Sequence, residues 1–169
     1  AAEYMMSEML YSGLTALGTD MTAQPDLATK WLSNDNATQW TFTLREGVKF
    51  SNGQELTSAD VVASLNKLLD PQTGAPGRRN LGPIKTVEAD GDYTVVVTTE
   101  TPFADLPVAL TYPTAKVVPA DIIANDFDSL AQVPVGSGPF KLQDFRVDEI
   151  AVLVKNADYF VQGLPYLNR

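Results

Sequence analysis

The sequence contains no cysteine and no histidine among its 169 residues. Without cysteine it has no disulfide framework and no thiolate nucleophile. Without histidine, the usual zinc sites and Ser-His-Asp catalysis are excluded. No apolar run approaches the roughly 20 residues that a membrane-spanning helix needs. These absences argue against catalysis more firmly than any motif argues for it, and we expect no cofactor, no metal and no enzymatic activity.

Basic residues are also few. The chain has 12 lysines and arginines against 21 aspartates and glutamates, which gives a formal net charge of −9. A nucleic-acid binder needs a basic face to neutralise phosphates, so this balance argues against nucleic acid as a partner. It also disfavours binding to an anionic membrane surface. The hydrophobic fraction of 44% is ordinary for a globular protein, and the length suffices for one domain with a real core.

The clearest local pattern runs from residue 40 to residue 60. Its apolar side chains fall on even positions, at Trp40, Phe42, Leu44, Val48 and Phe50. A period of two predicts extended chain with one buried face. Asn52 and Gly53 then predict a tight turn, because both residues tolerate a positive φ. Thr57 stands three residues before Asp60, the spacing of a capping box at the start of a helix.

The rest of the chain predicts an α+β fold, with a mostly antiparallel β-sheet and flanking helices. We expect helices over 1–17, 58–69 and 120–124, and strands over 26–33, 84–89, 93–99, 140–147 and 149–155. Met5, Met6 and Met9 recur at helical spacing in the first helix. They favour a core face, with an adaptable binding surface as the alternative. The segment 71–83 is a long loop, either solvated or in contact with a ligand.

One glycine-rich segment needs a separate interpretation. Gly136-Ser137-Gly138-Pro139 superficially looks like a phosphate-binding loop, but it lacks the lysine, the full glycine spacing and a following helix. It therefore predicts a backbone crossing where side chains would clash.

Four sequence blocks, taken together, resemble a known family. They are LATKWLSNDNATQWTFTLREGVKFSNGQELTSADVVASLNKLLDP from residue 27, PVGSGPFKL from residue 134, KNADYF from residue 155 and GLPYLN from residue 163. Their order and spacing are similar to those of the peptide/nickel-type (family 5) extracytoplasmic solute-binding proteins of ABC importers. Gln39, Ala157 and Phe160 depart from the usual family residues without disturbing the pattern.

The resemblance implies a partial lobe I of a two-lobed, periplasmic-binding-protein-like (class II, cluster C) fold. Residues 26–134 would form mainly the smaller subdomain, and residues 1–25 and 135–169 would be flanking elements. Lobe II would be absent. We therefore expect the chain to be a truncated form or a proteolytic remnant of a longer protein.

The implied function is capture of a peptide-like or other small solute between two closing lobes, for delivery to an ABC transporter permease. By position, the family's cleft-facing segments correspond to Tyr4, Arg78, Arg79 and Tyr112 in this sequence. The tyrosines would offer aromatic walls, and either arginine could pair with a ligand carboxylate. For each of the four, an ordinary surface or packing role stays open. Without lobe II, we expect the chain to bind solute weakly or not at all.

The resemblance further implies a protein that is monomeric and works in the periplasm or elsewhere outside the cytoplasm, free or as a membrane-anchored lipoprotein. Two alternatives stay open. One is the ligand-sensing domain of a regulator that reuses the same fold. The other is a hydrolase with two catalytic carboxylates, for which the sequence gives no specific pair.

Overall fold

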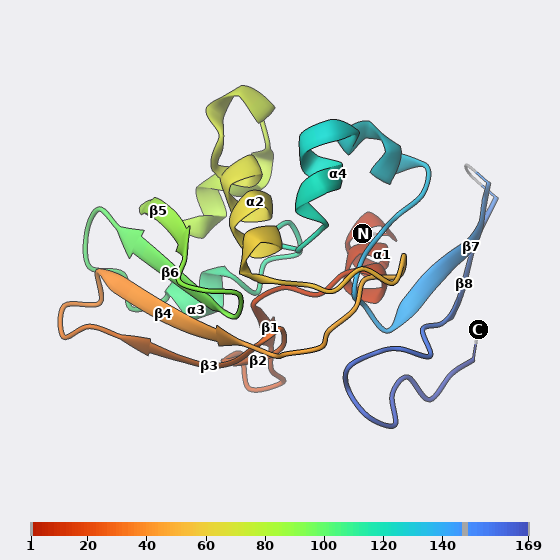
Figure 1. Ribbon diagram of the computed structural model, residues 1–169, viewed down its shortest axis with the longest axis horizontal. Helices are drawn as coiled ribbons and strands as arrows, with labels where there is room; N and C mark the ends of the chain where they lie inside the picture. Colours follow the sequence, from red (N-terminus) through yellow and green to blue (C-terminus); the bar gives the residue numbers. More distant parts are fainter. Residues whose placement is uncertain (1, 147–148, 169) are drawn as a thin grey trace.

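The computed structural model describes residues 2–146 and 149–168. Its α-helices are α1 (Ala2–Leu10), α2 (Ser58–Leu69), α3 (Leu106–Ala109) and α4 (Ala120–Asn125). Three 3₁₀ helices are η1 (Pro71–Thr73), η2 (Pro76–Leu81) and η3 (Phe127–Ala131). The strands are β1 (Thr15–Leu17), β2 (Ala23–Pro25), β3 (Ala28–Ser33), β4 (Gln39–Leu44), β5 (Ile84–Ala89), β6 (Thr94–Thr99), β7 (Phe140–Arg146) and β8 (Ile150–Lys155). The predicted α+β class is confirmed (Figure 1).

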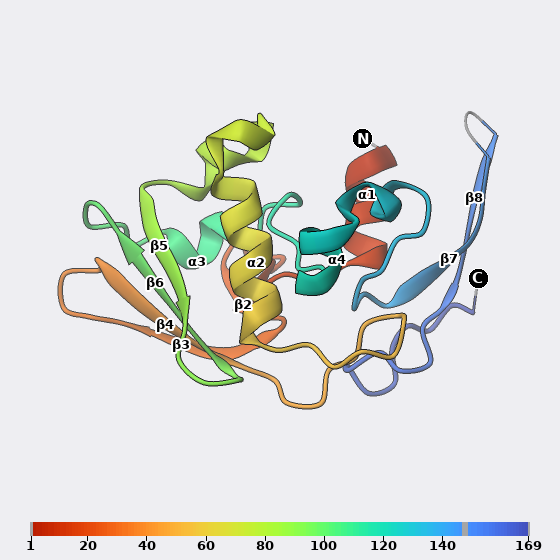
Figure 2. The ribbon, with the colours of Figure 1, turned by 45° about the horizontal axis from the view of Figure 1, so that its top comes forward.

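A four-stranded antiparallel sheet, in the order β3-β4-β6-β5, carries α2 on one face (Figures 1 and 2). Phe42 pairs with Trp31 on β3 and with Val95 on β6, so β4 lies in the middle of the sheet. Phe42, Val95 and the α2 residues Val61 and Leu65 are all at most 1% exposed. The predicted strands and the predicted helix over 58–69 therefore enclose the main core, as their alternating and helical patterns indicated.

The segment between β4 and α2 also follows the prediction. Gly53 has φ +88° and donates a hydrogen bond from its N–H to the carbonyl of Phe50, which closes the turn. The N–H of Thr57 donates to the Asp60 carboxylate at 2.8 Å, as expected for the N-terminal box of a helix. Val48 and Phe50 are 2% exposed, so the apolar row continues past the end of β4 into the core.

The prediction of one helix over 1–17 is wrong in its second half. Helix α1 ends at Leu10, and the residues after it leave the helix to bond with distant parts of the chain. Gly13 forms an antiparallel bridge with Lys116, and Thr15 begins β1, which pairs with β2. Met5 is 62% exposed, so the core-face interpretation is wrong for that residue. Tertiary hydrogen bonds outweigh helix propensity here.

Strands β7 and β8 form a separate antiparallel pair at the other end of the molecule from the four-stranded sheet (Figure 1). They confirm the predicted hairpin, although Val147, the last residue of the expected first strand, lies outside the described residues. The glycine-rich segment before β7 crosses the end of α1. The N–H of Gly138 donates to the carbonyl of Leu10 at 3.0 Å, and a Cβ at Gly138 would lie 2.5 Å from the Leu10 carbonyl carbon. The predicted backbone crossing is confirmed.

None of the helices in the described part of the chain is long and apolar enough to cross a membrane. The loop over 71–83 contains η1 and η2 and stands above the C-terminal end of α2 (Figure 2). Helix α4 lies beside α2, and α1 lies beyond α4, so these three helices gather over one side of the molecule. This arrangement positions the site described next.

Candidate functional site

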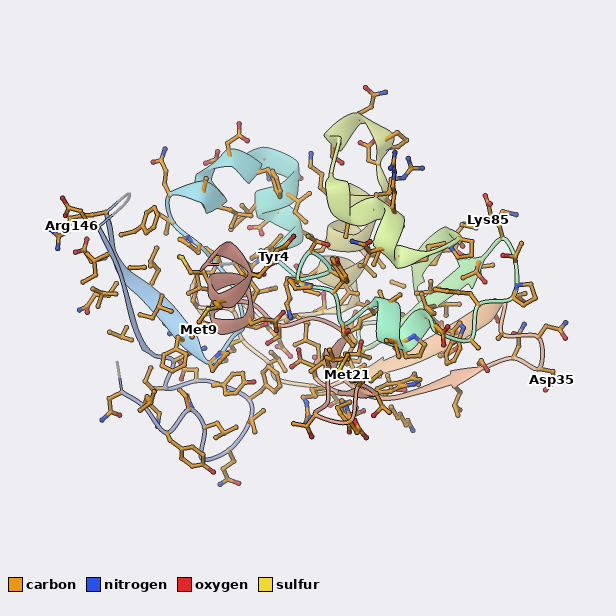
Figure 3. The ribbon with its side chains drawn as sticks, turned by 180° about the vertical axis from the view of Figure 1, so that it is seen from behind. Tyr4, Met9, Met21, Asp35, Lys85 and Arg146 are labelled. Carbon is orange, nitrogen blue, oxygen red and sulfur yellow. The ribbon has the colours of Figure 1, made fainter. Side chains whose placement is uncertain are left out.

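The four predicted site residues are all exposed. Tyr4 lies on α1 and is 52% exposed, and Tyr112 lies in the turn after α3 and is 41% exposed. Arg78 and Arg79 are exposed neighbours on η2. Figure 3 shows Tyr4 on the side of α1 that faces the middle of the molecule. Because they are exposed, all four side chains are available to a ligand. Exposure alone does not distinguish a binding residue from an ordinary surface residue.

The segments that carry these residues meet at residues 113–114. The hydroxyl of Ser7, one turn along α1 from Tyr4, donates a hydrogen bond to the carbonyl of Pro113 at 2.8 Å. Gly77, next to Arg78, packs against the side chain of Thr114 so closely that a Cβ there would lie 2.6 Å from the Thr114 Cβ. The structure thus joins α1, η2 and the turn at Tyr112, although η2 ends 31 residues before Tyr112 and α1 lies still further away in sequence.

A pocket of about 690 Å³ opens beside this junction, and we call it the α2–α4 pocket. Its walls come from α1, α2, the η1–η2 connection, residues 113–118, α4 and η3. The lining residues are Ser7, Tyr11, Ser64, Lys67, Leu68, Thr73, Ala75, Pro113, Thr114, Lys116, Val118, Ile123, Phe127, Asp128, Leu130 and Ala131. None of the four predicted residues lines it. The pocket depends on contacts between distant segments, which no local pattern in the sequence indicates.

Two lysines line the pocket, and they have different partners. The Lys116 side chain is only 7% exposed, and its Nζ pairs with a Glu8 carboxylate oxygen at 2.9 Å. Lys67 lies over the Phe127 ring, with Nζ 5.0 Å from the ring centroid. Burial raises the pKa of the Tyr11 hydroxyl, so this group stays protonated and able to donate at neutral pH.

A second charged cluster lies where β2 ends. Asp26 accepts a hydrogen bond from the N–H of Gly13 at 2.9 Å, and burial raises the pKa of the Asp26 carboxyl despite this bond and the positive charge of Lys116. The Arg45 guanidinium donates to the Asp26 carbonyl at 2.7 Å and lies 5.4 Å from the centre of the Phe160 ring. This cluster ties the sheet to the C-terminal segment. Within residues 2–146 and 149–168, no group of three or more acidic residues is arranged to hold a metal ion.

Residues 22–169 match the family of bacterial extracellular solute-binding proteins, family 5, in its middle region. The match covers most of the chain, and the chain belongs to this family. The family resemblance predicted from the sequence blocks is therefore confirmed.

Individual relatives agree with this assignment. The chain is 28% identical over 163 residues to the glutathione-binding protein GsiB of Salmonella typhi, which covers 96% of this chain and 32% of that protein. Among solved structures, AgaA from A.tumefacien R10 in complex with agropinic acid superposes with a TM-score of 0.92 at 34% identity, over 98% of this chain and 33% of that one. Haemophilus influenzae OppA in complex with RPPGFSPFR gives a TM-score of 0.84 at 26% identity, over 94% of this chain and 34% of that one. The chain spans about a third of the length of these relatives.

Proposed function

We propose that the chain is the first-lobe portion of the solute-binding component of an ABC importer. The longer protein captures a peptide-like or other small solute outside the cytoplasm and delivers it to a membrane permease. The observation that carries this proposal is the junction at residues 113–114, where the three segments predicted to face the ligand meet in a chain of this family. It is a binding role without catalysis, carried out by a monomer without a cofactor.

The chemistry of the four exposed residues suits a solute with a carboxylate and an apolar or planar part. A guanidinium, as on Arg78 or Arg79, can donate two parallel hydrogen bonds to one carboxylate. Tyr4 and Tyr112 offer aromatic faces with a hydroxyl for orientation. The relatives named above are a glutathione-binding protein and two proteins in complex with agropinic acid and with the peptide RPPGFSPFR, which are ligands of this class. The second lobe would close over the solute by a hinge motion, driven by contacts made only in the closed state.

The test uses the two-lobed protein and calorimetric titration with glutathione, a short peptide and agropinic acid. For the solute that binds, we expect Arg78→Gln or Arg79→Gln to weaken the affinity by roughly ten- to a hundredfold, as loss of a charged hydrogen bond costs about 1.5–3 kcal/mol. Tyr4→Ala and Tyr112→Ala should weaken it less. Lys30→Gln, an exposed control on β3, should not change it. If the four variants at Arg78, Arg79, Tyr4 and Tyr112 all bind like the parent, these residues are not the solute site.

We further propose that the longer protein works in the periplasm or on the outer side of the membrane, either free or held by a lipid anchor. The extracellular character of the family supports a location outside the cytoplasm. Fractionation of cells that express the full reading frame, combined with labelling by a fatty acid, separates a free protein from a lipoprotein. Recovery of the protein in the cytoplasmic fraction alone would contradict the proposal.

A further inference from the structure

The α2–α4 pocket combines an apolar wall with the charged side chains of Lys67, Lys116 and Asp128. The apolar wall is formed by Leu68, Ala75, Pro113, Val118, Ile123, Phe127, Leu130 and Ala131. A volume of about 690 Å³ is within the usual range of roughly 300–1,000 Å³ for small-molecule sites. Such a wall favours a ligand with a compact apolar body, because the body leaves water when it binds.

Most hydroxyls in the wall already have partners. Ser7 donates to the carbonyl of Pro113, and Ser64 both donates to the carbonyl of Val118 and accepts from its N–H. Thr114 differs, because its Oγ1 is buried with no hydrogen-bond partner among the described residues. This oxygen packs against Gly77 and is closed off from the open pocket, so a ligand there does not reach it, and polar selectivity comes from the charged groups of the wall.

The charged groups in the wall select the sign of the ligand. Lys116 is already paired with Glu8, whereas Lys67 takes part in none of the ion pairs formed within residues 2–146 and 149–168. The Lys67 ammonium therefore has only the Phe127 ring as a close electrostatic partner in that part of the chain. Asp128 also lines the wall but is exposed, so solvent screens its repulsion of an anion.

We propose that the α2–α4 pocket binds a small organic acid with an aromatic or branched apolar body, whose carboxylate pairs with Lys67. The apolar body contacts the Leu68–Phe127 side of the pocket, beside the Lys67 ammonium. Tyr4, Arg78, Arg79 and Tyr112 do not line this pocket, which adjoins the proposed solute surface at Pro113 and Thr114.

Two probes of the same shape test the charge requirement: phenylacetate, and phenylethanol as its neutral counterpart. We titrate each into the 169-residue chain and follow the backbone amide signals of the pocket residues by NMR. Phenylacetate should shift the signals of Leu68 and Ala131 and should bind about three- to tenfold more tightly than phenylethanol, the range for a partly exposed ion pair. Equal binding of the two probes, or no shift with either, would overturn the proposal.

Two variants identify the residues that carry the effect. Lys67→Gln should abolish the preference for phenylacetate, whereas Lys85→Gln, an exposed control on β5 far from the pocket, should retain it (Figure 3). Ala75→Phe should fill the pocket and remove the binding of both probes, with the amide spectrum elsewhere unchanged. Unchanged preference in Lys67→Gln, or unchanged binding in a folded Ala75→Phe, would show that the acid binds elsewhere.

Discussion

The buried carboxylate of Asp60 accepts a hydrogen bond at 2.8 Å from the backbone N–H of Ala120, a residue 60 positions further along the chain. Its other oxygen accepts a hydrogen bond from the N–H of Thr57 at 2.8 Å, and the residue is only 5% exposed. One carboxylate therefore holds the first turns of both α2 and α4, the two helices that form opposite walls of the α2–α4 pocket.

Asp60→Asn tests this double role. An amide has one oxygen instead of two acceptors, so one of the two N–H groups loses its partner inside the protein. We expect the free energy of unfolding to fall by about 1–3 kcal/mol, measured by urea denaturation. Asp35→Asn, at an exposed turn, is the matched control and should change it by less than about 0.5 kcal/mol. Similar values for the two variants would argue against a structural role for Asp60.

Gly138→Ala tests the crossing of the glycine-rich segment over α1. The new methyl group would fall 2.6 Å from the carbonyl oxygen of Met9, a backbone atom that cannot rotate away. We expect a loss of at least about 1–3 kcal/mol of unfolding free energy. Gly91→Asn is the control, because that position has φ +76° with open space around it, and asparagine tolerates this conformation. A Gly138→Ala protein as stable as the control would refute the close approach.

A comparison of α2 with α1 shows which parts of the fold could be predicted from the sequence. The start of α2 depends on the four-residue capping box from Thr57 to Asp60 and on a helical apolar stripe, both of which are visible locally. The end of α1 depends on the bridge between Gly13 and Lys116 and on the pairing of β1 with β2. These partners lie far along the chain or have weak strand signals of their own, so the helix predicted over 1–17 extends too far.

Tyr93 provides a pH-dependent prediction. Its hydroxyl donates to the Glu55 carboxylate at 2.6 Å, and this bond, more than any other effect, raises the pKa of Tyr93 to about 12. Because the native pKa lies above the unfolded value of about 10, the stabilisation is complete below pH 10 and is lost as the pH rises toward 12. Glu55→Gln should lower the pKa of this tyrosine in an ultraviolet titration, with Tyr93→Phe to assign the signal. An unchanged titration in Glu55→Gln would contradict the contact.

Asp26 provides a second pH-dependent prediction, which concerns a carboxyl group instead of a tyrosine hydroxyl. Burial raises its pKa above the ordinary value of 3.8, so the native state favours the protonated carboxyl. The stabilisation of the folded state that comes from protonated Asp26 is therefore complete below pH 3.8 and is lost as the pH rises through the native pKa. Asp26→Asn retains an acceptor for Gly13 and removes the charge. Relative to the parent, the variant should gain stability as the pH rises from below 3.8 through the native pKa of Asp26.

The same variant should affect Tyr159. Burial, and secondly the negative charge of Asp26, raise the pKa of Tyr159 to about 12. Asp26→Asn should therefore lower the pKa of this tyrosine in the ultraviolet titration, with Tyr159→Phe to assign the signal. No change in the titration would mean that Asp26 and Tyr159 are not electrostatically coupled.

The candidate site was less predictable than the fold. The family blocks pointed to Tyr4, Arg78, Arg79 and Tyr112 by position, and the structure shows that their three segments meet. The α2–α4 pocket was missed, because Lys67 reads as an ordinary exposed helix residue and Thr114 as part of an extended connection. Their significance arises from the packing of α4 against α2, a contact between elements about 50 residues apart with no local sequence signal.

The central proposal is that this chain is part of the first lobe of a two-lobed solute-binding protein and needs the second lobe to hold its ligand. Calorimetric titration of the 169-residue chain with glutathione, a short peptide and agropinic acid, beside the two-lobed protein, tests it most directly. We predict a Kd no tighter than about 1 mM for the chain alone, and binding of at least one of these solutes by the two-lobed protein with a Kd of about 1 μM or tighter. Micromolar binding of any of them to the chain alone would contradict the account.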